Sequence, residues 1–350
     1  MRINIRTNGR GNAWPVPLGQ EHPFYDKNNY EDLANASFSI IGYKDDKKVN
    51  KELLIDAGHG TIQYLIKSNN RIPDAIFLTH PHIDHFLSVD WIVQSYKRQY
   101  NKKYPVYASP LCWEQTLAAF PQLEQLVKFK PLYAGKACKI DEFSDMELIF
   151  YPVFHGESAA GAGMLLFEYE HNNRMYKALF TGDILIPLLR KRDFEHLQSC
   201  DVVYTDANNR FPYPNSNHWS VMRPEISGKE ESEFLKSWLK SKGNNTNWLV
   251  RPNIPVKFNK TIHGFFEEFL KETLSGQQLV LSVFDFCKKI DVRNVNLIHY
   301  SGSEDYKHYG KDIFNTDEFQ AWVNKSAIQL GLKSKFIVPQ AGEMFEWVRY

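Results

Sequence analysis

Short apolar runs alternate along the chain with amphipathic stretches, a pattern typical of a layered α/β protein. Two runs rich in β-branched and aromatic residues, over 37–43 and 52–56, predict a pair of strands joined by a polar turn. Apolar residues at helical spacing predict a helix over 88–100. Further strands are predicted over 75–79, 147–154, 164–169, 178–181, 202–205 and 295–300.

The stretch over 219–291 departs from this pattern, because two amphipathic helices, over 233–242 and 262–274, replace the strands. We interpret 219–291 as a helical insertion in a single domain that spans 1–350. Both helices have an apolar face that must be covered, so we expect a lid over the active site or a contact between two copies in a homodimer. The alternative is a helical pair that packs on its own domain away from the site.

The last predicted elements are a helix from Thr316 to Gly331 and a strand over 336–338. Thr316 is expected to cap the helix, because Asp317 and Glu318 follow it and acidic residues stabilise a helix N-terminus. The whole pattern favours one large α/β domain with an insertion over two separate domains.

Composition narrows the choice of partners and compartment. Lys and Arg total 42 against 41 Asp and Glu, which gives a net charge of +1 and no basic stripe of the kind that binds structured nucleic acid. Four cysteines far apart in the sequence predict neither a disulfide framework nor a thiolate zinc site. The first residues lack the apolar core of a signal peptide, and we see no apolar run long enough to span a membrane. We therefore expect a cytoplasmic protein.

Four potential metal ligands follow directly on an apolar strand. The segment reads Phe77-Leu78-Thr79-His80-Pro81-His82-Ile83-Asp84-His85. Residues two apart point to the same side of an extended chain, so His80 and His82 can hold one ion, and Pro81 keeps His80 extended. Asp84 and His85 lie where the chain turns into the predicted helix and can face a second ion. The alternative is a histidine-rich surface loop, but the strand before it and the helix after it favour the metal site.

Two complete coordination shells need more ligands than one loop can supply. His155, Asp183 and His299 each follow the end of a predicted strand, and each precedes or follows a glycine-containing turn. Taken singly, each would be read as a packed histidine or a capping aspartate. Together, in this order and at strand ends, they complete a ligand set for two ions.

These motifs resemble those of the metallo-β-lactamase superfamily, and the similarity extends from Ser37 to Trp347 with the insertion excepted. The resemblance is strongest to the branch that contains tRNase Z and small cyclic-phosphate phosphodiesterases. It implies the αβ/βα four-layer sandwich of that superfamily. It also implies one ion on His80, His82 and His155, another on Asp84, His85 and His299, and a bridging Asp183.

The branch assignment depends on two further segments. In this branch an acid at the end of one strand stands beside a histidine from a later His-Ser-Thr segment, and Asp206 and His218 match those roles. The match is imperfect, because aspartate replaces glutamate and Trp219 interrupts the segment. The alternative is an aspartate that caps a turn and a histidine on a surface loop. With Asp84, the pair Asp206 and His218 is predicted to be catalytic.

We expect a dinuclear hydrolase in which two divalent ions, zinc or else manganese or iron, share a bridging hydroxide and lower the pKa of water from 15.7 to about 7. His218, oriented by Asp206, would protonate the leaving oxygen. The interval between His155 and Asp183 is too short for the tRNA-binding arm that tRNase Z carries there. The expected substrate is therefore a small cyclic phosphate or cyclic nucleotide.

Two other functions stay open from the sequence. One is a lactone or thioester hydrolase; thioester hydrolysis would use the same metals but has no evident need for Asp206 and His218. The other is a non-hydrolytic or oxidative protein on the same scaffold, like the pyrroloquinoline quinone biosynthesis B relatives. The complete ligand set favours hydrolysis over this second alternative.

Overall fold

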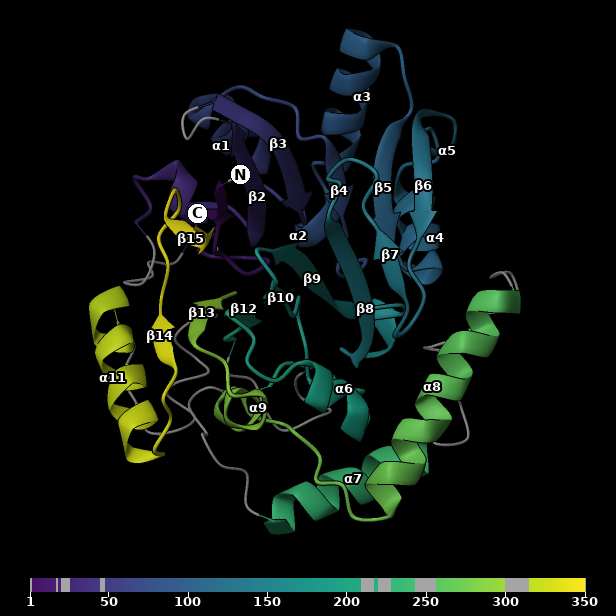
Figure 1. Ribbon diagram of the computed structural model, residues 1–350, viewed down its shortest axis with the longest axis vertical. Helices are drawn as coiled ribbons and strands as arrows, with labels where there is room; N and C mark the ends of the chain where they lie inside the picture. Colours follow the sequence, from purple (N-terminus) through teal and green to yellow (C-terminus); the bar gives the residue numbers. More distant parts are fainter. Residues whose placement is uncertain are drawn as a thin grey trace.

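Two β-sheets packed face to face form the centre of the molecule, and helices cover the outer face of each sheet (Figure 1). The computed structural model describes residues 2–16, 18–19, 26–44, 48–208, 217–219, 228–242, 256–299 and 315–349. This arrangement is the predicted four-layer sandwich.

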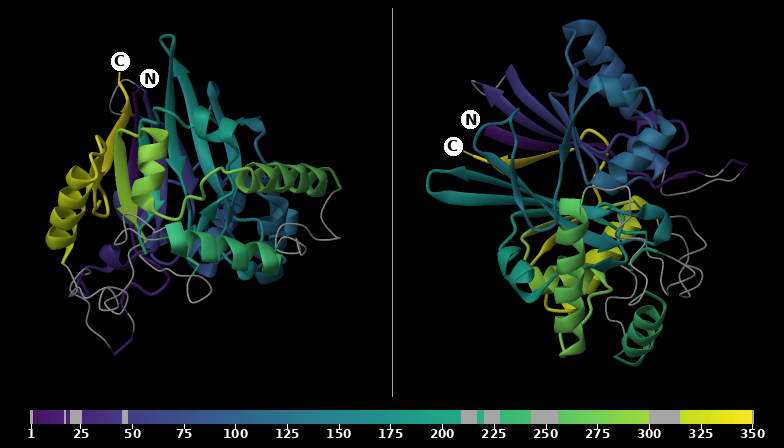
Figure 2. Two further views of the ribbon diagram at one scale, coloured as in Figure 1. Left: turned by 90° about the horizontal axis from the view of Figure 1, so that it is seen from below. Right: turned by 90° about the vertical axis from the view of Figure 1, so that its right-hand side faces the viewer.

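The first sheet combines antiparallel and parallel strands. Its order is β15 (Met344–Val348), β1 (Arg2–Gly9), β2 (Ser37–Lys44), β3 (Lys48–Ile55), β4 (Ala75–Phe77), β5 (Tyr104–Ala108) and β6 (Val127–Pro131). Pairing is antiparallel from β15 to β3 and parallel from β3 to β6. Strands β1 and β15 come from opposite ends of the chain and lie side by side (Figure 2).

Five helices cover the outer face of this sheet within the described chain, after the short 3-10 turn Tyr30–Leu33. They are α1 (Thr61–Ser68), α2 (Ile83–Phe86), α3 (Val89–Tyr100), α4 (Pro110–Ala119) and α5 (Leu123–Leu126). The apolar stripe of α3, with Val89, Ile92 and Val93, is buried against the sheet, as the helical spacing predicts.

The second sheet supplies most of the strand ends at the site. Its order is β11 (Ile186–Pro187), β8 (Met146–Phe154), β9 (Gly163–His171), β10 (Arg174–Phe180), β12 (Val202–Asp206), β13 (Asn294–Ile298) and β14 (Lys335–Ile337), and β7 (Ala137–Lys139) pairs with β8. A 3-10 turn, Glu157–Ala159, separates β8 from β9. Strands β10, β12, β13 and β14 are parallel, so their carboxyl ends lie at one edge.

Aromatic side chains fill the space between the two sheets. Phe77 stacks on Tyr107 at a ring-centroid distance of 4.6 Å, and Phe180 stacks on Tyr204 at 5.1 Å. Phe167 meets both Phe77 and Phe180 edge to face. Each such pair adds about 0.5–1.5 kcal/mol beyond the burial of its apolar area, so this layer fixes the two sheets relative to each other.

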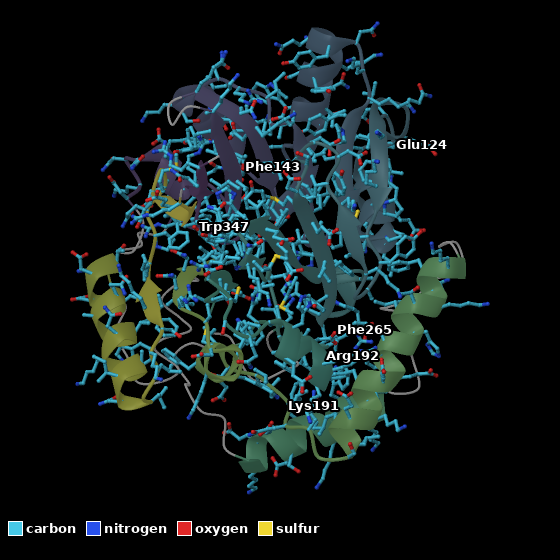
Figure 3. All side chains as sticks on the ribbon, in the orientation of Figure 1. Glu124, Phe143, Lys191, Arg192, Phe265 and Trp347 are labelled. Atoms are coloured by element: carbon cyan, nitrogen blue, oxygen red, sulfur yellow. The ribbon has the colours of Figure 1, made fainter. Side chains whose placement is uncertain are left out.

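The outer face of the second sheet is covered by the helices α6 (Lys191–His196), α7 (Gly228–Lys242), α8 (Val256–Leu274), α9 (Val283–Ile290) and α11 (Thr316–Gln329). Of these, α7, α8 and α9 belong to the expected insertion over 219–291. Helix α8 contacts α6 where Arg192 and Phe265 lie close together (Figure 3). The Arg190 guanidinium stands 3.8 Å over the Phe265 ring, and both Arg190 and Arg192 pair with Glu268.

The apolar faces of α7 and α8 are covered by the rest of the same domain. Phe234 and Trp238 of α7 and Phe266 and Phe269 of α8 belong to the core that the second sheet's outer face forms, and Trp238 meets Phe154 of β8 edge to face. A role of 219–291 as a lid or as a contact between two copies stays a prediction. The turn after α7 lies outside the described residues.

Several sequence-based boundaries need correction. Asn315, and not Thr316, caps α11, because its side chain accepts from the Glu318 backbone N–H while the Glu318 carboxylate accepts from the Asn315 N–H. Strand β14 is not the last strand, since β15 follows and pairs with β1. Among the described helices, none is long and apolar enough to cross a membrane.

Candidate metal centre

The seven predicted ligands all lie at the edge where strands of both sheets end. His80, His82, Asp84 and His85 follow β4, and the last two stand on the short helix α2. The other ligands follow strands of the second sheet: His155 follows β8, Asp183 follows β10 and His299 follows β13. Carboxyl ends of parallel strands are the usual place for sites in such sheets, because loops there converge over the sheet edge.

One group of potential ligands consists of His80, His82, His155 and Asp183, whose ligand atoms lie within 4.8 Å of one another. Asp183 Oδ2 is 3.7 Å from His80 Nε2 and 3.6 Å from His155 Nε2. His155 Nε2 is 3.2 Å from His82 Nδ1. Three imidazoles and a carboxylate converging in this way match the donor set of a zinc-type ion.

The second group consists of Asp84, His85, Asp183 and His299 within the same 4.8 Å limit. His299 Nε2 lies 3.1 Å from Asp183 Oδ2 and 3.3 Å from Asp84 Oδ2. His85 Nε2 is 3.4 Å from Asp183 Oδ1 and from Asp84 Oδ2. Asp183 belongs to both groups, and its Oδ2 lies close to histidines of each, while its Oδ1 lies close to His85.

Buried polar atoms with no hydrogen bond show that these residues suit a cation. In the described part of the chain, His80 Nε2, His85 Nε2 and Asp183 Oδ1 are buried and accept or donate no hydrogen bond. Leaving such groups without a partner costs about 1–3 kcal/mol of stability each, and a cation bound between them would remove this cost. The nitrogen and oxygen donors therefore fit divalent metal binding.

Electrostatics of the two groups differ. Burial lowers the pKa of His155 to about 3 and that of His80 well below its usual value, which keeps both imidazoles neutral and able to donate a lone pair. Burial acts in the same direction on His299, but the carboxylates of Asp183, Asp206 and Asp84 outweigh it and raise its pKa to about 10. The second group therefore attracts positive charge strongly.

Asp56, in the segment Asp56-Ala57-Gly58, orients two of the potential ligands from behind. Its Oδ2 accepts from His85 Nδ1 at 2.8 Å and from the Thr79 hydroxyl at 2.7 Å. The Thr79 oxygen in turn accepts from His80 Nδ1 at 3.0 Å. These bonds leave Nε2 of both histidines for a metal. Asp56 itself has φ +53°, a conformation unusual for any residue but glycine.

Close backbone packing explains why residue 58, two positions after Asp56, is a glycine. A Cβ on Gly58 would come 1.7 Å from the Asp84 carbonyl oxygen. The chain can pass this close to the ligand-bearing helix only without a side chain. Ser88, where the branch often has glycine, donates from its hydroxyl to the Gly58 carbonyl at 2.7 Å.

The predicted pair of Asp206 and His218 is brought together beside the metal groups. His218 Nδ1 donates to Asp206 Oδ2 at 2.5 Å, and both side chains are buried. The His218 ring stacks on His299 at 5.3 Å and meets His155 edge to face at 4.8 Å. Burial favours the neutral acid of Asp206, but His218 outweighs it and lowers the carboxyl pKa.

The two chain neighbours of His218 bond to Asp206 and to His155, and no pattern in the sequence predicted either contact. Trp219, first seen as an interruption, is fully buried and donates from its indole N–H to the Asp206 carbonyl at 2.9 Å. The Asn217 carbonyl accepts from His155 Nδ1 at 2.9 Å. The segment 217–219 thus ties the acid–histidine pair to one metal ligand.

A cavity of about 310 Å³ opens over these residues. Its lining includes ligands from both groups and His218. The other lining residues are Asn12, Ala13, Trp14, Ile83, Asn208 and Asn217. A cavity of this size takes a small ligand.

The other described histidines lie outside the two metal groups. His59 contacts the Tyr30 hydroxyl at 3.3 Å, His196 pairs with Glu168, and His263 pairs with Glu267. His171 stacks on Tyr169. His22 and His308 lie outside the described residues.

Several solved structures have the same fold as this chain. The chain aligns with a diphosphatase of the PhnP family at TM-score 0.59 and 16% identity, over 99% of this chain and 98% of that one. It aligns with the metallo-β-lactamase fold protein YhfI from Bacillus subtilis at TM-score 0.55 and 10% identity, over 98% of each chain. It aligns with human tRNase Z, short form, at TM-score 0.51 and 12% identity, over 99% and 100%. These alignments show that the chain has the metallo-β-lactamase fold, and the two groups of potential ligands lie at the site described above.

A family comparison is more specific. The model of the family described as anti-Pycsar protein Apyc1 matches residues 46–222, half of the chain. The chain belongs to this family. No curated protein sequence matches it.

Proposed function

We propose that the protein is a dinuclear phosphodiesterase that opens a small cyclic phosphate or cyclic nucleotide. The observation that carries this proposal is the position of His218, which is held by Asp206, contacts a histidine of each metal group and lines the same cavity. A hydrolase that expels a weakly basic thiolate does not need such a proton donor, whereas expulsion of a sugar alkoxide does.

His80, His82 and His155 would hold one divalent ion, Asp84, His85 and His299 a second, and Asp183 would bridge them. The mixture of imidazole and carboxylate favours zinc, with manganese or iron as alternatives. When bound, two such ions make water acidic enough to react at neutral pH and offset the charge of a phosphodiester.

The chain's own residues then handle protons. A water oxygen attacks phosphorus and one of the water protons is released to solvent, the bond to one ring oxygen breaks, and the product is a phosphate monoester with a free hydroxyl. Asp84 accepts a hydrogen bond from the attacking water. His218, with Nδ1 held by Asp206, gives the Nε2 proton to the departing oxygen and regains one from solvent. The carboxylate of Asp206 keeps the ring in the orientation and charge state that this transfer needs.

The size of the cavity supports a small substrate. About 310 Å³ accommodates a mononucleotide but not a folded RNA, and its walls contain no Lys or Arg among the described residues. The name of the family, anti-Pycsar protein, is compatible with an activity on a small signalling nucleotide. The thioester and cofactor-biosynthesis alternatives gain no comparable support from the site. A lactone also expels an alkoxide, so the substrate screen separates that alternative from the proposed one.

A substrate screen tests the proposal. Purified, metal-loaded protein is assayed against cyclic nucleotides, cyclic sugar phosphates, aryl phosphodiesters, lactones and a tRNA precursor, and metal content is measured in parallel. We expect turnover of the small cyclic phosphates and two metals per chain, with Asp183→Ala losing both metal and activity. Turnover of lactones or thioesters alone, or efficient cleavage of the tRNA precursor, would refute the proposal.

A further inference from the structure

Trp14 is a large aromatic side chain at the cavity over the metal groups, and the proposed hydrolysis leaves it without a role. Its side chain is 74% exposed, although it lines the cavity together with His82, Asp84 and His218. The exposed indole leaves a large apolar face that borders the cavity and is open to contact with a bound molecule.

The loop that carries Trp14 is fixed to the ligand groups. The Arg10 carbonyl accepts from the His299 backbone N–H at 2.8 Å, and the Arg10 side chain forms a buried ion pair with Asp32 at 2.8 Å. Gly11 bonds in both directions to the backbone of the segment 34–36. Asn12 Oδ1 accepts from the Trp14 backbone N–H at 3.1 Å, so the backbone that carries the indole has a defined place relative to His299.

The cavity walls away from the ligands are uncharged. Apart from the ligand groups and the Asp206–His218 pair, the cavity is lined by amides and by apolar side chains. The amides of Asn12, Asn208 and Asn217 can donate and accept hydrogen bonds, while Trp14 and Ile83 offer apolar surface. Such a wall suits a flat, uncharged, polar-edged ring, and a nucleobase has this chemistry.

We propose that Trp14 stacks on the nucleobase of the substrate while the phosphate lies at the metal groups. This inference rests on the proposed phosphodiesterase function and narrows its substrate to cyclic mononucleotides. Every base has a π-face, so stacking on Trp14 selects for the presence of a base and only weakly for its identity. The sugar phosphate alone would lose this contact.

Kinetics with and without a base test the role of Trp14. Trp14→Ala is compared with wild type on cyclic AMP and on a base-free methyl riboside cyclic phosphate. We expect kcat/KM on cyclic AMP to fall about 5- to 100-fold, mainly through KM, and kcat/KM on the base-free compound to stay unchanged. Trp14→Phe should recover most of the loss, because a phenyl ring can still stack.

Trp91→Ala is the matched control, since Trp91 is 57% exposed but lines a different hollow, between α1 and α3. It should leave both substrates unaffected. An unchanged kcat/KM of Trp14→Ala on cyclic AMP, or an equal loss on both substrates, would overturn the stacking role.

Binding measurements separate this inference from the proposed function. Calorimetric titration with AMP and with ribose 5-phosphate should show tighter binding of AMP in wild type and equal binding in Trp14→Ala. Equal binding of the two compounds to wild type would overturn the stacking role, whatever the enzyme hydrolyses. Wild-type protein that hydrolyses no cyclic phosphate but still binds AMP through Trp14 would refute the phosphodiesterase proposal and leave the base-stacking site standing.

Discussion

Removal of His218 gives the most direct test of how the site would break a phosphodiester. His218→Ala deletes the proposed proton donor and leaves the seven potential ligands in place. The Asp206 carboxylate stays hydrogen-bonded after this change, because it also accepts from the backbone N–H groups of Ile184 at 3.2 Å and Asn208 at 2.9 Å. We therefore expect a folded protein with normal metal content.

The size of the effect follows from the leaving group. A positioned general acid contributes about 10²- to 10⁴-fold in rate, which is about 3–5 kcal/mol of the barrier. His218→Ala should lose this factor in kcat on cyclic AMP, whose sugar oxygen leaves as a strongly basic alkoxide without a proton. Bis(4-nitrophenyl) phosphate expels a weakly basic phenolate, so the same variant should lose less than about 10-fold on it.

The assay compares kcat on both substrates at saturating metal, together with metal analysis of each preparation. His263→Ala is the control, because His263 is half-exposed on α8 and pairs only locally with Glu267 among the contacts described for it. Equal losses of His218→Ala on both substrates, with metal content intact, would show that His218 does not act on the leaving oxygen. Loss of metal in the variant would instead make His218 a ligand.

Three other predictions concern the support of the site. Asp56→Ala should weaken metal affinity about 10- to 100-fold by freeing the His85 ring, and unchanged competition with a chelator would contradict this. Gly58→Ala should lower the melting temperature by several degrees, because its Cβ would lie 1.7 Å from the Asp84 carbonyl oxygen; a wild-type melting curve would show that the turn can shift freely. Trp238→Ala should destabilise the fold by about 3–5 kcal/mol in urea melts while the metal content of the folded protein stays normal, and a loss below about 1 kcal/mol would mean that α7 contributes little to the core.

The strand ends made much of the site predictable from sequence. An apolar run that stops at a histidine or aspartate puts that side chain at the edge of a sheet, and parallel strands put several such edges together. His155, Asp183 and His299 could be found by this rule, and the structure brings them together with the residues after β4. The pair Asp206 and His218 followed from a family resemblance and not from any local pattern.

Contacts between distant segments were the part that sequence could not supply. The indole of Trp219 reaches the Asp206 carbonyl only because β12 and the segment 217–219 pack together, and no periodicity encodes that contact. Asn315 and Thr316 are neighbours that both favour the N-cap position, so side-chain geometry had to decide between them. Strand β15 is short, and its partner β1 lies at the opposite end of the sequence.

The pairing of β1 with β15 bears on the order in which the protein can be made. Ile3 and Ile5 of β1 are fully buried, yet β1 is synthesised long before β15, and one of its edges has no partner until 344–348 emerge from the ribosome. The backbone N–H of His299, a potential ligand, donates to the Arg10 carbonyl, so this late part of the site depends on residues that are made early. Until β15 is made, the nascent chain therefore carries a strand with an unpaired edge and two isoleucines that are not yet covered, which exposes it to aggregation or chaperone binding.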